Sequence, residues 1–339
     1  MTYHIYITVA GENKISILTM DAESGELTLQ EDVALGGAPG PLAVDPEQRF
    51  LYAGVRSTQE ISSFRIQKET GQLTLISNVP LDADPCALYT DRTGRFLLSA
   101  YYSAGRVAVH ALTPKGAVEK APVEWLSTAK GAHALQTDPS NQFAFAPHVR
   151  ESNIILQFLF DEAAGTLTPN PEAPQVTPPP GTGPRHFCFH PTKDIVYFDN
   201  EQGCSVTVYH LDSSAGTLQA FQTISTLPQD FDEENTCAQI HIAASGRTLY
   251  ASNRGHDSIA CFSIDPDTGR LSPMGQEPTE EMPRAFNLTP QDEFLLAGSL
   301  VSENIACYRV NQETGVLSHT YTRHIGERPM WILPLDLTD

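Results

Sequence analysis

Arginine, histidine and glutamate residues stand at the ends of short apolar runs in the segment 182–203, TGPRHFCFHPTKDIVYFDNEQG. Arg185 and His186 precede the apolar run 187–189, and Glu201 follows the next run, 195–198. A carboxylate or an imidazole can activate water as a general base. A guanidinium can bind an oxyanion, a carboxylate or a phosphate. These residue types therefore indicate chemistry on a small anionic molecule, provided that the fold brings them together.

A turn signature recurs along the chain and divides it into repeats. Clear copies are DAESGELTL at 21–29, DEAAGTLTP at 161–169 and DPDTGRLSP at 265–273. Glycine tolerates the positive φ that a short hairpin loop requires, so each copy predicts a hairpin between two strands. Seven copies place a glycine every 45 to 53 residues: Gly25, Gly71, Gly116, Gly165, Gly216, Gly269 and Gly315.

A second pattern fills the rest of each repeat. It is an apolar strand, a polar turn and another apolar strand, as in PLAVDPEQRFLYAGV at 41–55 and AFNLTPQDEFLLAGS at 285–299. Each repeat thus contains four strands, and seven such repeats are typical of a β-propeller. The sequence predicts an all-β protein, a seven-bladed β-propeller with four antiparallel strands per blade, as a single domain over 1–339.

The two ends of the sequence are predicted to complete one blade together. The run RPMWILPL at 328–335 has the character of a lone first strand. Three segments near the N-terminus have the character of strands two, three and four of a blade: HIYITVA, NKISILTM and GELTLQED. Pairing of the N- and C-terminal strands would close the ring and remove its open sheet edges. The proline-rich segment 169–184 is predicted to be a long loop between blades.

The candidate functional residues occupy equivalent positions in different repeats. The start of a first strand and the end of a second strand lie at the same end of a propeller's channel, because the two strands are antiparallel. We therefore expect one end of the channel to gather arginines and histidines around one carboxylate. At or near first-strand starts are His133, Arg185, His186, His241 and Arg284, and after second strands are Arg56, His148, Glu201 and Arg254.

Composition limits the classes of partner. The 339 residues include 21 Lys and Arg against 41 Asp and Glu, a formal net charge of −20. Such a chain repels nucleic acid, although a few arginines in a cleft still attract a small anion. No apolar run approaches the ~20 residues of a membrane span, and no signal peptide is evident. The six cysteines are widely spaced, as in proteins with free thiols. We expect a cytoplasmic protein, monomeric or weakly oligomeric, with no nucleic-acid or membrane partner.

Several segments carry a resemblance to a known family. Four segments resemble the lactonase family of seven-bladed propellers. They are GAHALQTDPSNQFAFAP, GPRHFCFHPTKDIVYFDNEQGCSVTVYHLD, IHIAASGRTLYASNRGHDSIACFSID and the C-terminal RPMWIL. The likeness covers essentially the whole chain. The likeness is greatest to the bacterial 6-phosphogluconolactonase branch of the family, and the segments PLAVDPEQRFLYAGVR and PRAFN contribute to it. The family also includes the fungal carboxymuconate-lactonizing enzymes.

The resemblance implies a site of one histidine, two arginines and one glutamate at the channel mouth, without a metal or a cofactor. By motif these are His133 in GAHALQ, Arg185 in GPRH, Glu201 in DNEQG and Arg254 in SNRG. The chain departs from the family at Ala134, where a serine is frequent. It also departs at APHVRES, residues 146–152. These departures bear on the substrate more than on the reaction class.

Chemistry and resemblance together predict hydrolysis of a sugar δ-lactone, with 6-phosphogluconolactone as the first candidate substrate. Glu201 or His133 would activate water, and Arg185 would stabilise the oxyanion or the acid product. Six residues are candidates for substrate binding, and the arginines among them would bind an anionic substituent such as a phosphate. These residues are Arg254, His186, His241, Arg284, Arg56 and His148.

Other functions are compatible with the same residues. One is a hydrolase or cycloisomerase of another lactone, non-phosphorylated or carboxylated, and a second is a binding propeller without catalysis. Calcium binding near Glu201 is disfavoured, because Arg185 and Arg254 would repel a cation. The sequence has no G-x-S-x-G elbow, no H-E-x-x-H motif and no tight His/Cys cluster.

Overall fold

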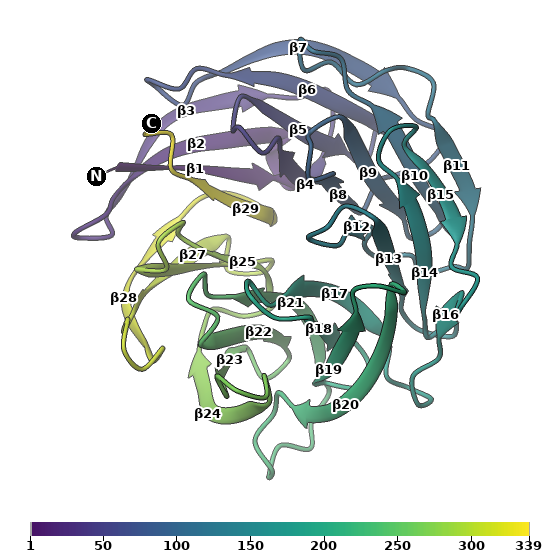
Figure 1. Cartoon of the computed structure of the whole chain (residues 1–339). Coiled ribbons are helices and arrows are strands. Elements are labelled where there is room, and N and C mark those ends of the chain that lie inside the picture. The colour runs from purple at the N-terminus through teal and green to yellow at the C-terminus, as the bar shows by residue number, and fades with distance from the viewer. Residues whose placement is uncertain (1, 339) are drawn as a thin grey trace.

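The computed structural model describes residues 2–338 and forms a ring of seven antiparallel sheets around a central channel (Figure 1). Six sheets have four strands, and one has an additional short strand. The predicted seven-bladed β-propeller is therefore confirmed. Within residues 2–338 the helical structure is one 3-10 turn, η1 (Ala10–Glu12), and no helix has the length and apolar character needed to cross a membrane.

The blades are numbered here along the chain, and each is described from its innermost strand outward. Blade 1 is β4 (Pro39–Val44), β5 (Phe50–Val55), β6 (Glu60–Ile66) and β7 (Leu73–Pro80). Blade 2 is β8 (Ala87–Thr90), β9 (Phe96–Tyr101), β10 (Arg106–Ala111) and β11 (Glu124–Ser127). Blade 3 is β12 (Gln136–Thr137), β13 (Phe143–His148), β14 (Ile154–Asp161) and β15 (Thr166–Pro169), with β16 (Gln175–Val176) also on β14. Blade 4 is β17 (Pro184–Phe189), β18 (Ile195–Asn200), β19 (Ser205–Asp212) and β20 (Thr217–Ser225).

The remaining blades follow the same order. Blade 5 is β21 (Thr236–Ile242), β22 (Thr248–Arg254), β23 (Ser258–Ile264) and β24 (Leu271–Pro278). Blade 6 is β25 (Pro283–Leu288), β26 (Phe294–Ser299), β27 (Asn304–Val310) and β28 (Leu317–His324). Blade 7 is β29 (Pro329–Leu335), β1 (Thr2–Val9), β2 (Lys14–Asp21) and β3 (Leu27–Ala34).

Blade 7 joins the two ends of the chain, as predicted. The C-terminal strand β29 is innermost and pairs antiparallel with β1, with His4 opposite Leu335 and Ile7 opposite Ile332. Figure 1 shows the N- and C-terminal ends lying close together at this blade. The pairing gives β1 a partner on both edges, because β2 occupies the other edge. The ring is thereby closed by backbone hydrogen bonds rather than by a covalent link.

The seven turn glycines have two structural roles. Each has a φ between 68° and 82°, as the hairpin prediction requires. Each also packs against the second strand of the preceding blade, so closely that an added Cβ would lie 2.0 to 2.4 Å from a side-chain carbon there. A residue with a side chain would therefore separate the blades. In order from Gly25 to Gly315, the side chains that an added Cβ would contact are those of Phe294, His4, Phe50, Phe96, Phe143, Ile195 and Thr248.

Polar side chains of the inner strands link neighbouring blades across the channel wall. Thr90 Oγ1 donates to the carbonyl oxygen of Val44 at 2.9 Å, and Gln136 Nε2 donates to that of Phe187 at 3.2 Å. In the same way Asn287 Nδ2 donates to Ile332 O at 3.1 Å, and Gln239 Oε1 accepts from Phe286 N at 2.8 Å. These bonds satisfy backbone groups at the inner sheet edges, which have no further strand beside them.

Blade 3 departs from the regular pattern. Its outer strand is split, because β15 ends at Pro169 and the short β16 pairs with Ile155 and Leu156 of β14 after an interruption. Pro169, Pro171 and Pro174 have no N–H to donate to a ladder, which explains the interruption. The segment 169–184, predicted to be a loop throughout, therefore contains one short strand.

Candidate active site

Arg185 and Glu201 form a buried ion pair at one mouth of the channel. Arg185 lies near the start of β17 and Glu201 directly after β18, and these strands pair with Pro184 opposite Asn200. Arg185 Nε donates to Glu201 Oε2 at 2.8 Å, and the residues are 1% and 7% exposed. The antiparallel pairing thus brings together two residues that the sequence separates by a strand, a turn and a second strand.

A β-bulge explains why neighbouring residues both face the channel. In a regular strand, Arg185 and His186 would point to opposite faces of the sheet. The register of β17 on β18 shifts between Pro184 and Phe187, and both residues line the same small cavity. Register shifts also occur near the mouth end of β4, β21, β25 and β29. The mouth is therefore built from irregular strand starts, which simple alternation does not predict.

Three further arginines surround the ion pair. Arg254 Nη2 lies 3.7 Å from Glu201 Oε2 and donates to the carbonyl of Cys237 at 2.7 Å. Burial, together with the charge of Arg185, lowers the pKa of Arg254 to about 10. Burial and the neighbouring arginines lower the pKa of Arg284 to about 9. Arg56 donates to Asp84 Oδ2 at 2.5 Å. With these pKa values, Arg254 and Arg284 remain protonated at neutral pH.

Positive charge exceeds negative charge at this mouth. Glu201 and Asp84 each pair with arginines there. Asp199, the next carboxyl, is wholly buried, and burial raises its pKa to about 7. Asp199 Oδ1 accepts a hydrogen bond from the backbone N–H of His186 at 2.6 Å, so it orients β17. In a chain with a net charge of −20, this local excess attracts a small anion.

Two histidines stand beside the arginines. His133 Nδ1 and His186 Nε2 are 3.1 Å apart, and Arg185 Nη1 lies 3.3 Å from His186 Nδ1. Burial and nearby arginines hold the pKa of both imidazoles well below the usual value, so both are neutral at pH 7. The ring of Tyr102, which follows β9, packs edge-on against His133, with centroids 5.8 Å apart.

Two predicted site residues lie apart from this cluster. Both ring nitrogens of His148 bond locally, Nδ1 with Ala146 O at 2.9 Å and Nε2 with Thr128 Oγ1 at 3.0 Å. His241 lies deeper in the channel, on β21, where its ring packs edge-on against Phe286. The structure brings together His133, Arg185, His186, Glu201, Arg254, Arg284 and Arg56.

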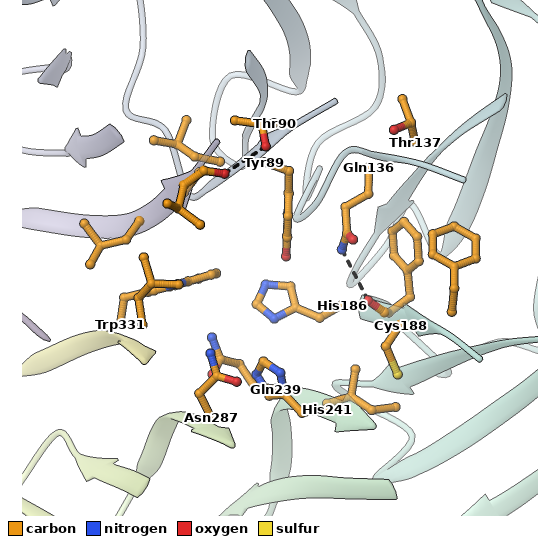
Figure 2. A pocket seen from close by; sticks show the side chains of 18 of the residues that line it. Tyr89, Thr90, Gln136, Thr137, His186, Cys188, Gln239, His241, Asn287 and Trp331 are labelled. Atoms are coloured by element: carbon orange, nitrogen blue, oxygen red, sulfur yellow. Dashed lines mark hydrogen bonds between the residues drawn. The ribbon is translucent and has the colours of Figure 1, made fainter. Parts of the chain in front are cut away.

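The channel is divided into two parts. A cavity of about 10 Å³ lies among the arginines and histidines of the mouth, which is room for about one water molecule. A larger chamber of about 410 Å³ lies beyond it and is lined by residues of all seven inner strands. His186, Gln239 and Trp331 line both parts and form the waist between them. Figure 2 shows these three side chains converging from different blades.

The larger chamber is poorly suited to an anion. Its one guanidinium belongs to Arg92, which donates to the backbone carbonyls of Asp138 at 3.1 Å and Thr137 at 2.8 Å. Several of its polar side chains bond the neighbouring blade, among them Gln136, which donates to Phe187 O in Figure 2. The mouth, rather than the chamber, therefore has the charge needed to bind a small anion.

Sequence reasoning did not select several residues of the site. Tyr102 follows a second strand, as Arg56 does, so the positional rule includes it, although it was not among the candidate site residues. The rule for first-strand starts also includes Gln239 and Trp331, although neither was among the candidate site residues. Asp199 lies inside an apolar run, and only the fold shows that it supports His186. Among residues 2–338 no group of three or more His, Cys, Asp and Glu side chains is arranged to hold a metal ion.

Known proteins resemble this chain over its whole length. The family described as "Lactonase, 7-bladed beta-propeller" matches residues 4–334. A 6-phosphogluconolactonase of Pectobacterium carotovorum is 36% identical over 333 residues, which is 98% of each chain. That of Yersinia pestis (strain Pestoides F) is 35% identical with the same coverage.

Solved structures share the fold. A periplasmic gluconolactonase of Pseudomonas aeruginosa superposes with a TM-score of 0.92 over 100% of both chains at 24% identity. A Bacteroides uniformis protein gives 0.88 at 28% identity, over 98% of this chain and 99% of the other. The match of the family over nearly all residues, with relatives above one-third identity, shows that the chain belongs to the lactonase family of seven-bladed β-propellers, a family of lactone-hydrolysing enzymes.

Proposed function

We propose that this protein hydrolyses the δ-lactone of a phosphorylated sugar acid, 6-phosphogluconolactone, at the Arg/His/Glu mouth of the channel without a metal ion. The observation that carries the proposal is the excess of guanidinium groups around one buried glutamate, in a chain whose net charge would otherwise repel such a substrate. The bacterial relatives at 35 and 36% identity, which are named 6-phosphogluconolactonases, support the same substrate.

The reaction adds one water molecule across the ring ester. Water attacks the carbonyl carbon, a base accepts its proton, and negative charge develops on the carbonyl oxygen. The bond from that carbon to the ring oxygen then breaks, and the ring oxygen takes up a proton to become a hydroxyl group. Glu201 and His133 are the candidate bases. Arg185, fixed by its bond to Glu201, would stabilise the oxyanion and the carboxylate product.

The outer arginines would hold the phosphate. Arg254, Arg284 and Arg56 surround the ion pair, and their planar groups can each donate two hydrogen bonds to phosphate oxygens. Burial and the repulsion of neighbouring arginines lower the pKa of Arg284, and a bound dianion would relieve that repulsion. A sugar lactone needs more room than the cavity of about 10 Å³ offers. We infer that these side chains move apart on binding.

The direct test follows the opening of 6-phosphogluconolactone generated in situ, with and without the purified protein. Acceleration well above spontaneous opening, with one atom of ¹⁸O incorporated from labelled water, is expected. A cycloisomerase breaks or forms the ring bond without adding water, so accelerated opening without incorporation of ¹⁸O would replace hydrolysis by that reaction. No acceleration would overturn the proposed substrate, and a panel of non-phosphorylated and carboxylated lactones would then be assayed.

We also propose that the protein acts in the cytoplasm, as a monomer or weak oligomer. All six cysteines are free thiols, and four of them are buried, which suits a reducing compartment. Light scattering after size exclusion should give a mass near the 37.0 kDa of one chain. A larger stable assembly would contradict the monomer.

A further inference from the structure

We propose that His186 is a positioning residue that fixes the tautomer of His133, so that His133 presents its Nε2–H to the lactone and Glu201 is left as the base. The inference rests on the function proposed above and makes it more specific, because it separates the roles of the two candidate bases. It derives from the order of three groups in contact: Arg185, His186 and His133.

The direction of the first bond is set by arginine. A guanidinium has donors and no acceptor, so in the contact of 3.3 Å between Arg185 Nη1 and His186 Nδ1 the arginine donates. His186 Nδ1 must then carry a lone pair. Because its pKa is held well below the usual value, His186 is neutral and bears its single proton on Nε2.

The second bond follows from the first. His186 Nε2 lies 3.1 Å from His133 Nδ1, so the Nε2–H of His186 donates to Nδ1 of His133. His133 is also neutral, since burial and nearby arginines hold its pKa low. Its one proton must therefore be on Nε2. In this state His133 has no basic nitrogen to offer to water, because its lone pair is already engaged by His186.

The surrounding structure holds His186 in place. Its backbone N–H donates to Asp199 Oδ1 at 2.6 Å, and its ring packs edge-on against Trp331, with centroids 5.9 Å apart. His186 is 4% exposed and lies at the waist of the channel. Contacts with β17 and β29 together therefore determine the orientation of the His186 ring. A solvent-exposed histidine would have no such contacts to fix its ring.

The assignment completes the proton balance of hydrolysis. Glu201 contacts Arg185 and Arg254 through Oε2, and neither contact uses Oε1. Glu201 Oε1 accepts the proton of the attacking water and later gives it to the departing ring oxygen. His133 Nε2–H donates a hydrogen bond to the carbonyl oxygen as charge develops there, without transferring its proton.

The first experiment observes the tautomer directly, without any substrate. Long-range ¹H–¹⁵N correlation spectra of protein labelled with ¹⁵N-histidine distinguish a protonated from an unprotonated ring nitrogen. His133 and His186 are assigned by comparison with single variants. We expect Nε2–H with an unprotonated Nδ1 for both residues at pH 7. Protonation of His133 at Nδ1 would overturn the proposal.

A pair of variants then separates positioning from packing. The amide of glutamine reaches the place of Nε2, so His186→Gln keeps a donor for His133. The shorter His186→Asn keeps only a group near Arg185. We expect kcat within about tenfold of wild type for His186→Gln and a loss of about 10²-fold for His186→Asn, with KM little changed in both. Exposed His319→Gln is the matched control.

The hydrogen bonds from Arg185 to His186 and from His186 to His133 are called the relay here. The outcomes distinguish this relay from the proposed hydrolysis. Equal kcat for His186→Gln and His186→Asn, with the His133 spectrum unchanged, would overturn the relay while leaving lactone hydrolysis intact. If wild type shows the expected tautomer but opens no lactone, the proposed function fails and the relay stands. Melting temperatures show whether each variant folds. Should His186→Asn not fold, the wild-type spectrum and the His133 spectrum of His186→Gln still decide the question.

Discussion

Arg185 Nε donates to Glu201 Oε2 across 2.8 Å, and this pair is almost completely excluded from solvent. Burying an ion pair costs desolvation energy, which apolar residues in the same space would not incur. The pair adjoins a second arginine, Arg254, and the neutral His186. Its position and its cost support the role in hydrolysis that we propose for it.

Replacing the carboxylate should stop catalysis without unfolding the protein. Glu201→Gln keeps an oxygen that can accept from Arg185 but removes the base, so kcat should fall by about 10²- to 10⁴-fold. Initial rates corrected for spontaneous opening measure the effect. Glu31→Gln, on the exposed strand β3, is the matched control and should have wild-type rates. Turnover near wild type in Glu201→Gln would refute the assignment of the base.

Arg284 should matter for phosphorylated substrates alone. Arg284→Gln removes a donor to the phosphate, and hydrogen bonds to charged groups contribute about 1.5–3 kcal/mol, so KM for 6-phosphogluconolactone should rise roughly 10- to 100-fold. KM for glucono-δ-lactone should stay unchanged. The melting temperature should not fall, because the variant relieves repulsion by Arg185, Arg254 and Arg56. An equal rise in KM for both lactones would place the phosphate elsewhere.

Acidification should destabilise the protein through its buried histidines. Burial lowers the pKa of His110, His148 and His241 to about 4, below the unfolded value of about 6.5. The unfolded chain therefore binds more protons than the folded one in this window. Stability is fully present above about pH 6.5 and is lost as pH falls toward 4. Thermal melting between pH 7.5 and 4.5 should show a falling midpoint, and a midpoint independent of pH would be inconsistent with neutral buried imidazoles.

Asp199 should show the opposite pH dependence. Burial raises its pKa to about 7, above the unfolded value of about 3.9. The folded state then binds the extra proton, so this contribution to stability is present below about pH 3.9 and is lost as pH rises through 7. Asp199→Asn cannot ionise and keeps an acceptor for His186 N–H. The melting temperature of the variant relative to wild type should increase from pH 5 to pH 8, and a constant difference would contradict the raised pKa.

Chelation should leave the activity unchanged. Glu201, the carboxylate at the centre of the mouth, is engaged by Arg185 and Arg254, whose charges oppose the binding of a cation. Rates measured before and after dialysis against EDTA should agree. A loss of activity that Ca²⁺ or Mg²⁺ restores would require a metal in the mechanism.

The sequence by itself determined the ring and the gathering of the main site residues. The spacing of the turn glycines gave the number of blades, and the terminal strand patterns gave their closure through β1 and β29. Arg185, Glu201 and Arg254 could be placed at one mouth because antiparallel strands return to the same end. These features follow from the period of the repeats, the polarity of their residues and the direction of the strands. All three can be read from local stretches of the sequence.

Only the tertiary structure decided how the side chains meet. Alternation along a strand fails at the bulge of β17, so the shared orientation of Arg185 and His186 could not be read from spacing. His241 lines the deeper chamber alone, whereas Gln239, two residues earlier on the same strand, lines both the chamber and the mouth. The direction of the bonds from Arg185 to His133 depends on contacts between blades 3 and 4. Burial between blades, which no local pattern contains, sets the protonation of these groups and so their chemistry.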